Sequence, residues 1–243
     1  MGDIDAQRYG RSFAEVYDTW YPEDDTTAGC VRYLAGLGSG GPVLELGVGT
    51  GRIALGLAAL GLDVTGIDAS EPMLDVLRSK DPHSTVRTVT ADLGTPTGWP
   101  EGPFDLVVAV CNLLCNITDP AKQAACIATA ATRLRPGGHL VVEAFEPAPL
   151  TVGPQLATSE VHDDHVVLIA TDADPDTAVV TGQHIELRDG EPVRLRPWRI
   201  RATTPQEIDR WSTDAGLSLV ERRRTWGADG PLADGLISVY RRD

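Results

Sequence analysis

The amino-acid sequence predicts a doubly wound α/β fold, with a Rossmann-like sheet of seven strands and an added antiparallel β insertion. Five apolar strand-like segments alternate with helix-length segments over residues 40–146. Continuous Val, Leu and Ile runs that alternate with helices are typical of a parallel sheet covered on both faces. Two more strands near the C-terminal end lie close enough in sequence to form an antiparallel pair that closes the sheet.

The elements of the parallel part follow one another in a regular order. The prediction comprises a strand at 42–47, a helix at 51–61, a strand at 63–68, a helix at 70–80, strands at 85–93 and 104–110, a helix at 119–134, a turn at 135–138 and a strand at 139–145. Ser70 is the expected N-cap of the second helix, with Pro72 in its first turn.

Residues 148–203 interrupt this pattern. They contain β-branched runs separated by the turn clusters 172–177 and 188–192, without a helical period, which predicts the antiparallel insertion after the fifth strand. A helix then begins at Thr204 and Pro205 and ends at Gly216, before the last strands at 217–224 and 235–242. We therefore expect an N-terminal helical lid at 1–40, a core at 41–147 and 204–243, and the insertion at 148–203.

Composition and charge narrow the class of protein. The chain of 243 residues, 42% apolar and 23% charged, is long enough for one large α/β domain. Its 21 Lys and Arg stand against 35 Asp and Glu, a net charge of −14, which disfavours nucleic acid as a partner. The N-terminus has charges throughout and no apolar run of the kind that a signal peptide needs, and no apolar stretch reaches the length of a membrane span, so we expect a cytoplasmic protein without membrane contact.

The four cysteines and the two short basic runs have simple structural interpretations. The cysteines form no CxxC pair and lie in or beside apolar runs, which predicts reduced thiols and no metal site. The basic runs at 222–224 and 241–242 are expected to be charges on the solvent face of a late strand.

The stretch Val43–Gly51, VLELGVGTG, joins the first strand to the first helix through three glycines. A dinucleotide fingerprint would place two residues before its third glycine, whereas Gly47, Gly49 and Gly51 are spaced by one residue each. The carboxylate of Glu45 disfavours a pyrophosphate at this turn and suits a ligand that carries positive charge. The lysine of a P-loop is absent.

Further polar residues follow the carboxyl ends of the next strands, where open parallel sheets bind their ligands. Asp68 ends the second strand and can accept hydrogen bonds from both hydroxyls of a ribose. Asp92 follows the third strand, and Cys111 and Asn112 follow the fourth.

With Glu45, the glycine loop, Asp68, Asp92 and the RPGG turn before the fifth strand, the sequence resembles the class I S-adenosylmethionine-dependent methyltransferases. The resemblance implies that the glycine loop contacts the methionine end of this cofactor, that Asp68 binds the ribose and that Asp92 recognises the adenine amino group. It also implies cofactor contacts for Glu45, Met73, Leu93 and Cys111, and it requires no metal.

The N-terminal segment concentrates aromatic residues. Tyr9, Phe13 and Tyr17 are spaced by four, which predicts one face of a single helix, and Trp20 and Tyr21 follow. This face either closes over the cofactor as a lid, which we favour, or simply packs onto the domain.

The same segment, the run FDLVVAVCNLLCNI and the insertion are similar to bacterial natural-product N-methyltransferases of the amino-sugar and lincosamide type. That resemblance implies that Tyr9 contacts the cofactor and that the acceptor site involves Phe13, Tyr17, Leu114, Cys115 and Asn116. Tyr17 and Asn116 are the candidate catalytic residues. Asn116 stands where the amino-sugar enzymes have a histidine, and an amide cannot act as a base.

The sequence thus predicts methyl transfer to a small-molecule acceptor, most simply an amine nitrogen, by in-line displacement in which proximity and orientation supply most of the catalysis. The insertion is a candidate surface for a homo-oligomer. An oxygen or carbon acceptor, for which His162 and His165 are candidate bases, or a non-methylating binding protein on the same fold are the alternatives. A nicotinamide oxidoreductase is disfavoured by the glycine spacing and Glu45.

Overall fold

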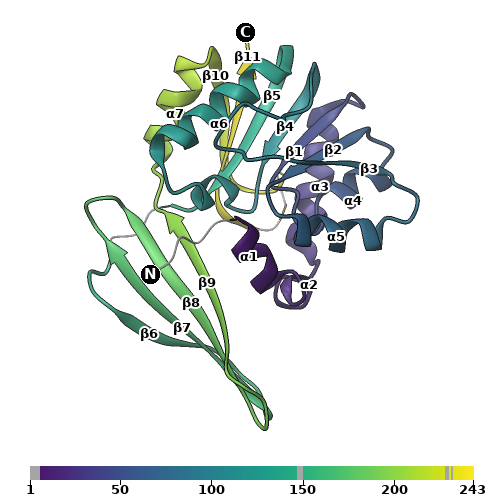
Figure 1. The fold of residues 1–243 in the computed structure, drawn as a ribbon. Coiled ribbons are helices and arrows are strands. Elements are labelled where there is room, and N and C mark those ends of the chain that lie inside the picture. Colours follow the sequence, from purple (N-terminus) through teal and green to yellow (C-terminus); the bar gives the residue numbers. More distant parts are fainter. Residues whose placement is uncertain (1–5, 147–149, 228–229, 231) are drawn as a thin grey trace.

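Seven strands form one sheet in the order β10-β11-β5-β4-β1-β2-β3, which confirms the predicted double winding (Figure 1). The computed structural model describes residues 6–146, 150–227, 230 and 232–243. The strands are β1 (Val43–Leu46), β2 (Val64–Asp68), β3 (Val86–Thr90), β4 (Phe104–Ala109), β5 (Leu134–Ala144), β10 (Leu217–Thr225) and β11 (Leu232–Arg242). β1 to β5 are parallel, and β11 pairs antiparallel with both β5 and β10.

The strand order reverses between β1 and β4. From β1 the chain proceeds outward through β2 to β3, and it then returns to β4 on the other side of β1. In open α/β sheets, ligands bind beyond the carboxyl ends of the strands at this kind of reversal. The glycine loop after β1 and the Cys111–Asn112 segment after β4 therefore flank the place where a ligand is expected.

Helices cover both faces of the sheet, as predicted. On one face, α3 (Asp25–Gly38), α4 (Ala54–Ala59) and α5 (Glu71–Lys80) share a buried apolar cluster with β1, β2 and β4. On the other face, α6 (Pro120–Arg133) and α7 (Pro205–Asp214) pack on the same strands and on β5.

The predicted helix caps are present. Ser70 Oγ accepts a hydrogen bond from the backbone N–H of Met73 at the start of α5. Thr204 and Glu207 form a reciprocal capping box at the start of α7, and Gly216 follows its end with φ +78°.

Several boundaries differ from the prediction, and two of the differences lie at glycines. α4 begins at Ala54 instead of Gly51, because Gly49 and Gly51 have positive φ angles that a helix cannot contain. The expected turn at 135–138 lies within β5, where the pairing with β4 jumps from Leu134 opposite Phe104 to His139 opposite Leu106. The extra residues form an irregularity that carries the positive φ of Gly137.

The prediction of one N-terminal helix through Tyr17 is wrong. α1 (Ala6–Phe13) ends before Tyr17, which begins the short helix α2 (Tyr17–Trp20). The carbonyl of Ser12 accepts a hydrogen bond from Arg196 Nε at 2.9 Å, and the N–H of Val16 bonds to Phe13 instead of continuing the helix. Arg196, which is distant in sequence, thus donates its hydrogen bond to the backbone at the point where α1 ends.

The predicted insertion is a separate four-stranded antiparallel sheet of β6 (Gln155–Val161), β7 (His165–Asp174), β8 (Val179–Arg188) and β9 (Arg194–Arg201). It projects from the core beside α1 and α2 (Figure 1). The expected boundary at 147–148 lies outside the described residues, as do the first residues of the expected lid.

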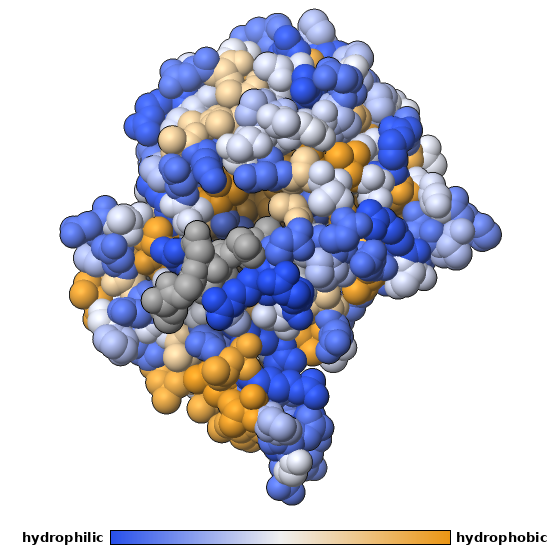
Figure 2. All heavy atoms as spheres, in the orientation of Figure 1, coloured by the Kyte–Doolittle hydropathy of each residue, from blue (hydrophilic) through white to orange (hydrophobic). Residues whose placement is uncertain are grey.

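The insertion has an inner face toward the core and an outer face. His184, Arg196 and Trp198 mark the inner face, against which α1 packs. The outer face exposes apolar side chains in neighbouring register positions, and Figure 2 shows hydrophobic residues gathered over this part of the molecule. These exposed residues include Leu156, Val161, Leu187 and Leu195.

The four cysteines and the basic run at 222–224, which the sequence singles out, lie in different surroundings. All four cysteines are unpaired, and three are buried, whereas Cys111 is half-buried. Arg222 of β10 pairs with Asp209 of α7 at 2.6 Å. Among the described residues, no helix is long and apolar enough to cross a bilayer.

Candidate functional site

The glycine loop after β1 is held by main-chain bonds to β2 and leaves one glycine facing open space. The N–H groups of Gly47 and Val48 both donate to the carbonyl of Ile67, at 2.7 and 3.1 Å. Gly49 has φ +53°, and a Cβ built on it would come no closer than 3.9 Å to another atom. A Cβ on Gly51, by contrast, would lie 2.8 Å from Leu77 of α5, so this glycine permits helix packing. Only part of the glycine motif is therefore free to meet a ligand.

Asp68 organises the same loop from the end of β2. Its Oδ2 accepts a hydrogen bond from Gly49 N at 2.9 Å, and its Oδ1 accepts one from Ser70 N at 2.8 Å. Burial raises the pKa of Asp68, and these backbone donors counteract the rise. Each carboxylate oxygen retains a lone pair for a further donor, as recognition of a ribose requires.

Two buried acceptors near the strand reversal lack hydrogen-bond partners among the described residues. They are Glu45 Oε2 on β1 and Asn112 Oδ1 after β4, and the two residues are only 4% and 7% exposed. Burial raises the pKa of Glu45 to about 8, although the charge of Arg52 opposes this rise. Buried polar atoms are rarely left unpaired in native proteins, so both atoms fit a ligand that offers donors.

Arg52 is a site residue that sequence reasoning passed over. Its Nη2 donates to Cys111 Sγ at 2.9 Å, which links the glycine loop to the end of β4. The guanidinium also lowers the pKa values of Tyr17 and Cys111, against the larger effect of burial. The sequence shows that Arg52 directly follows Gly51, but only the fold shows that its guanidinium lies beside Cys111 and Tyr17.

α1 and α2 are tied to the ends of β1 and β2. Gln7 Nε2 donates to the carbonyl of Ala69 at 2.6 Å. Asp18 of α2 accepts from Thr50 of the glycine loop at 2.6 Å and pairs with Lys80 of α5 at 2.7 Å. Both short helices therefore lie at the carboxyl edge of the sheet.

A buried arginine joins this N-terminal segment to the insertion. Arg196 of β9 is 4% exposed, and its Nη1 pairs with Glu186 of β8 at 2.6 Å. Its Nε bonds to Ser12 O, and its guanidinium lies 5.0 Å from the ring centre of Trp20. The N-terminal segment and the insertion therefore meet around this side chain.

A pocket of about 320 Å³ lies between the N-terminal segment, the strand ends and the inner face of the insertion. Its wall is largely aromatic, with amide and cationic groups toward the sheet. The residues that line it are Tyr9, Phe13, Tyr17, Tyr21, Arg52, Cys111, Asn112, Asn116, Phe145, Ile169, His184, Trp198 and Ile200.

The structure brings together several of the residues predicted from sequence. Tyr9, Phe13, Tyr17, Cys111 and Asn116 all line this pocket, and the rings of Tyr9 and Phe13 stack at 4.5 Å.

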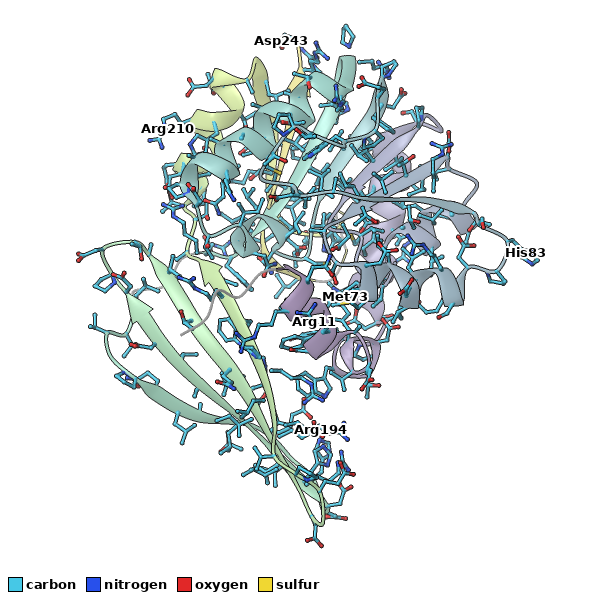
Figure 3. All side chains as sticks on the ribbon, viewed as in Figure 1. Arg11, Met73, His83, Arg194, Arg210 and Asp243 are labelled. Atoms are coloured by element: carbon cyan, nitrogen blue, oxygen red, sulfur yellow. The ribbon has the colours of Figure 1, made fainter. Side chains whose placement is uncertain are left out.

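Other predicted residues lie elsewhere. Leu114 and Cys115, expected at the acceptor, are each 1% exposed and point into the core. Leu93 is likewise buried in the core, and Met73 is covered by α1 (Figure 3). Asp92 is exposed after β3 and accepts a hydrogen bond from Gly94 N at 2.8 Å.

The titratable side chains that line the pocket can donate hydrogen bonds but are poorly suited to act as bases. Burial raises the pKa of Tyr17 well above its usual value, so its phenol keeps its proton at neutral pH. Trp198 Nε1 donates to His184 Nδ1 at 3.0 Å, which leaves the hydrogen of the neutral imidazole on Nε2. Burial and the charge of Arg196 lower the pKa of His184, so the neutral form prevails. In that state His184 offers a donor and lacks a free basic nitrogen.

Comparison with solved structures and known sequences supplies independent evidence. The methyltransferase domain family matches residues 43–138. The structure of the CcbJ methyltransferase from Streptomyces caelestis superposes with a TM-score of 0.90 and 36% identity, over 98% of this chain and 99% of that chain. CalS10 from Micromonospora echinaspora, an amino pentose methyltransferase solved with S-adenosylmethionine, shares the fold with a TM-score of 0.73, 18% identity and complete coverage of both chains.

A curated relative, the cypemycin N-terminal methyltransferase of a Streptomyces species, is 30% identical over 146 residues, or 59% of each protein. The putative methyltransferase YqeM of Bacillus subtilis is 38% identical over 109 residues, 43% of this chain and 42% of that protein. The chain thus covers less than two thirds of the length of these two relatives. Because the CcbJ match extends over nearly all of both chains at 36% identity, and because the methyltransferase domain family matches residues 43–138, this chain belongs to the class I S-adenosylmethionine-dependent methyltransferases.

Proposed function

We propose that this chain transfers a methyl group from S-adenosylmethionine to an amine nitrogen of a small natural product. The observation that carries the cofactor half is the pair of unpartnered buried acceptors, Glu45 Oε2 and Asn112 Oδ1, on the two strands that flank the reversal. An ammonium group would satisfy such acceptors, and the cofactor has one. A pyrophosphate offers no hydrogen-bond donor to either acceptor.

We assign the cofactor to groups at the carboxyl ends of β1 and β2. Asp68 accepts from the ribose hydroxyls, Gly49 admits close backbone approach and Glu45 receives the ammonium. Arg52 provides a positive charge beside the glycine loop, suited to the carboxylate of the methionine part. The bound cofactor supplies an electrophilic methyl group on a sulfonium.

The pocket residues hold the acceptor in line with that methyl group. A neutral amine attacks through its own lone pair, the bond from carbon to sulfur breaks, and the extra proton leaves to water, so that no strong base is needed. Tyr17, Asn116 and His184 offer hydrogen bonds that orient the acceptor. The names of CalS10 and the cypemycin enzyme, which act on an amino sugar and an N-terminus, support the choice of nitrogen.

The proposal is tested by incubating the full chain with methyl-¹³C-labelled S-adenosylmethionine and a panel of amino-sugar nucleotides and lincosamide-type amines. Each amine is matched with an analogue that has a hydroxyl at the same position. We expect S-adenosylhomocysteine to form with the amines alone, and the product's ¹³C NMR signal to report an N-methyl group.

Other outcomes of this assay separate the alternatives. A label on oxygen or carbon would replace the amine proposal with the corresponding acceptor class. Cofactor binding without turnover of any amine in the panel would favour a non-methylating protein on the same fold. Tight binding of NADH together with no binding of S-adenosylhomocysteine would overturn the cofactor assignment.

We also propose that the outer face of the insertion pairs with a second copy of the chain. Leu156 and Leu195 are 66% and 55% exposed on the two edge strands of this face, β6 and β9, and a large exposed apolar surface is typical of an interface. Replacing both by lysine should convert an oligomer to a monomer in light-scattering measurements, with cofactor binding retained. Leu60→Lys, at an equally exposed leucine on the core, is the control. A monomeric wild-type protein would refute this proposal.

A further inference from the structure

The hairpin between β6 and β7 gathers three side chains that can ligate a metal ion. They are Glu160 and His162, two apart in sequence, and His165, the first residue of β7. One ligand atom from each lies within 4.8 Å of the other two. The cysteine spacing predicts no metal site, and the sequence pattern marks these two histidines only as candidate bases.

The register of the hairpin places all three on the same face. Glu160 lies opposite Val167, and Val161 opposite Val166, so His162 faces His165 across the turn, where His162 N bonds to His165 O at 2.9 Å. Side chains two apart on a strand share a face, and directly opposite residues have neighbouring Cβ atoms. The register of the backbone therefore brings the three side chains together. They lie on the inner face of the insertion, which also carries His184.

The side chains of these three residues also contact one another. His162 Nε2 lies 2.9 Å from Glu160 Oε2, and the two imidazole rings stack at 4.2 Å with an angle of 7° between their planes. A cation at the edges of the two rings, beside the carboxylate, would satisfy all three groups.

A carboxylate outside the cluster orients one ligand. Asp164 Oδ1 lies 2.6 Å from His165 Nδ1, and Arg188 pairs with Asp164. A hydrogen on Nδ1, donated to this carboxylate, leaves the lone pair of His165 on Nε2. Metal-ligating histidines commonly have such a partner, which fixes the tautomer and makes the ligating nitrogen more basic.

We propose that Glu160, His162 and His165 form a binding site for a borderline divalent cation, with Zn²⁺ as the best fit. Two imidazoles and one carboxylate are a recognised zinc ligand set, and they leave at least one position for water or a further ligand. The acidic turn, which includes Asp163 and Asp164, attracts a cation to this hairpin. Zinc bound here ties the start of β7 to the edge strand β6, near the pocket side of the insertion.

The test is titration of the full chain, free of any polyhistidine tag and stripped with a chelator, with zinc chloride in a calorimeter. We expect one zinc ion per chain, and His162→Ala or His165→Ala should weaken binding by about tenfold or more. Asp164→Asn should weaken it by about tenfold through the orientation of His165. Cobalt in place of zinc should give a visible spectrum that His165→Ala alters.

His83→Ala is the matched control, because this exposed histidine lies at the opposite edge of the core (Figure 3). Binding of S-adenosylhomocysteine should be unchanged in every variant, which shows that each is folded and separates this proposal from the proposed function. Wild-type protein without saturable zinc uptake would overturn the proposal. So would uptake that His83→Ala reduces as much as the two hairpin variants do.

Discussion

Replacing Asp68 by alanine is expected to weaken binding of S-adenosylhomocysteine by about 100-fold or more. The carboxylate is assigned two hydrogen bonds to the ribose, and bonds to a charged acceptor contribute about 1.5–3 kcal/mol each. It also accepts the N–H of Gly49 at 2.9 Å, so its loss releases the glycine loop. Because every tenfold loss of affinity corresponds to about 1.4 kcal/mol, two weakened interactions suffice for the expected effect.

The matched control is Asp63→Ala, an exposed aspartate just before β2. Calorimetric titration of both variants should show near wild-type affinity for Asp63→Ala alone. Asp68→Asn keeps the shape of the side chain and one neutral acceptor, and should fall between the wild type and Asp68→Ala. If Asp63→Ala and Asp68→Ala weaken binding equally, Asp68 does not hold the ribose.

The sequence predicts the sheet well because its strands are buried on both faces and its helices carry local signals. The apolar strand runs, Ser70, Thr204 and Gly216 each act within a few residues of their own position. The same locality explains the strand-end residues: where a parallel strand stops, its last side chains must lie at the shared edge. The strand pattern alone therefore suffices to place Glu45, Asp68 and Cys111 at this edge.

The pocket wall depends on contacts that no local pattern reveals. Residues 113–116 form a 3-10 helix, in which positions three apart share a face. Leu113 and Asn116 therefore share one face, while Leu114 and Cys115 turn into the core.

The break between α1 and α2, and the part of the pocket wall that the insertion forms, both depend on contacts between residues far apart in sequence. Arg196 meets the end of α1 across 184 positions of sequence, and His184 gains its fixed tautomer from Trp198 on the next strand. A histidine on a β-branched run gives no sign that it faces a pocket. Only the packing of the insertion against α1 shows it.

Binding of S-adenosylhomocysteine at pH 7 should release a proton, and Glu45→Gln should abolish this release. The pKa of Glu45 is about 8 in the free protein, so this carboxyl is mostly protonated at neutral pH. An ammonium beside it stabilises the charged form, lowers the pKa and expels the proton. Between about pH 5 and 8, affinity should therefore rise with pH, because deprotonation is part of binding.

The same carboxyl gives the free protein the opposite dependence. A folded-state pKa of about 8 against an ordinary 4.5 means that the native state binds more protons than the unfolded state in this window. Its contribution to stability is complete below about pH 4.5 and is lost as the pH rises through 8. As the pH rises from about 5 to 8, the free protein should therefore lose stability while its affinity for S-adenosylhomocysteine increases. Glu45→Gln should remove most of both pH dependences.

Calorimetry at pH 7 in buffers of different ionisation enthalpy counts the released protons directly. Glu45→Gln should also weaken binding by about 10- to 100-fold, the cost of losing one buried charged partner of about 1.5–3 kcal/mol. Glu101→Gln, at a carboxylate that is 85% exposed, should change neither quantity. If wild-type protein binds the ligand without proton release, or if Glu45→Gln releases the same number of protons, the ammonium is not seated against Glu45.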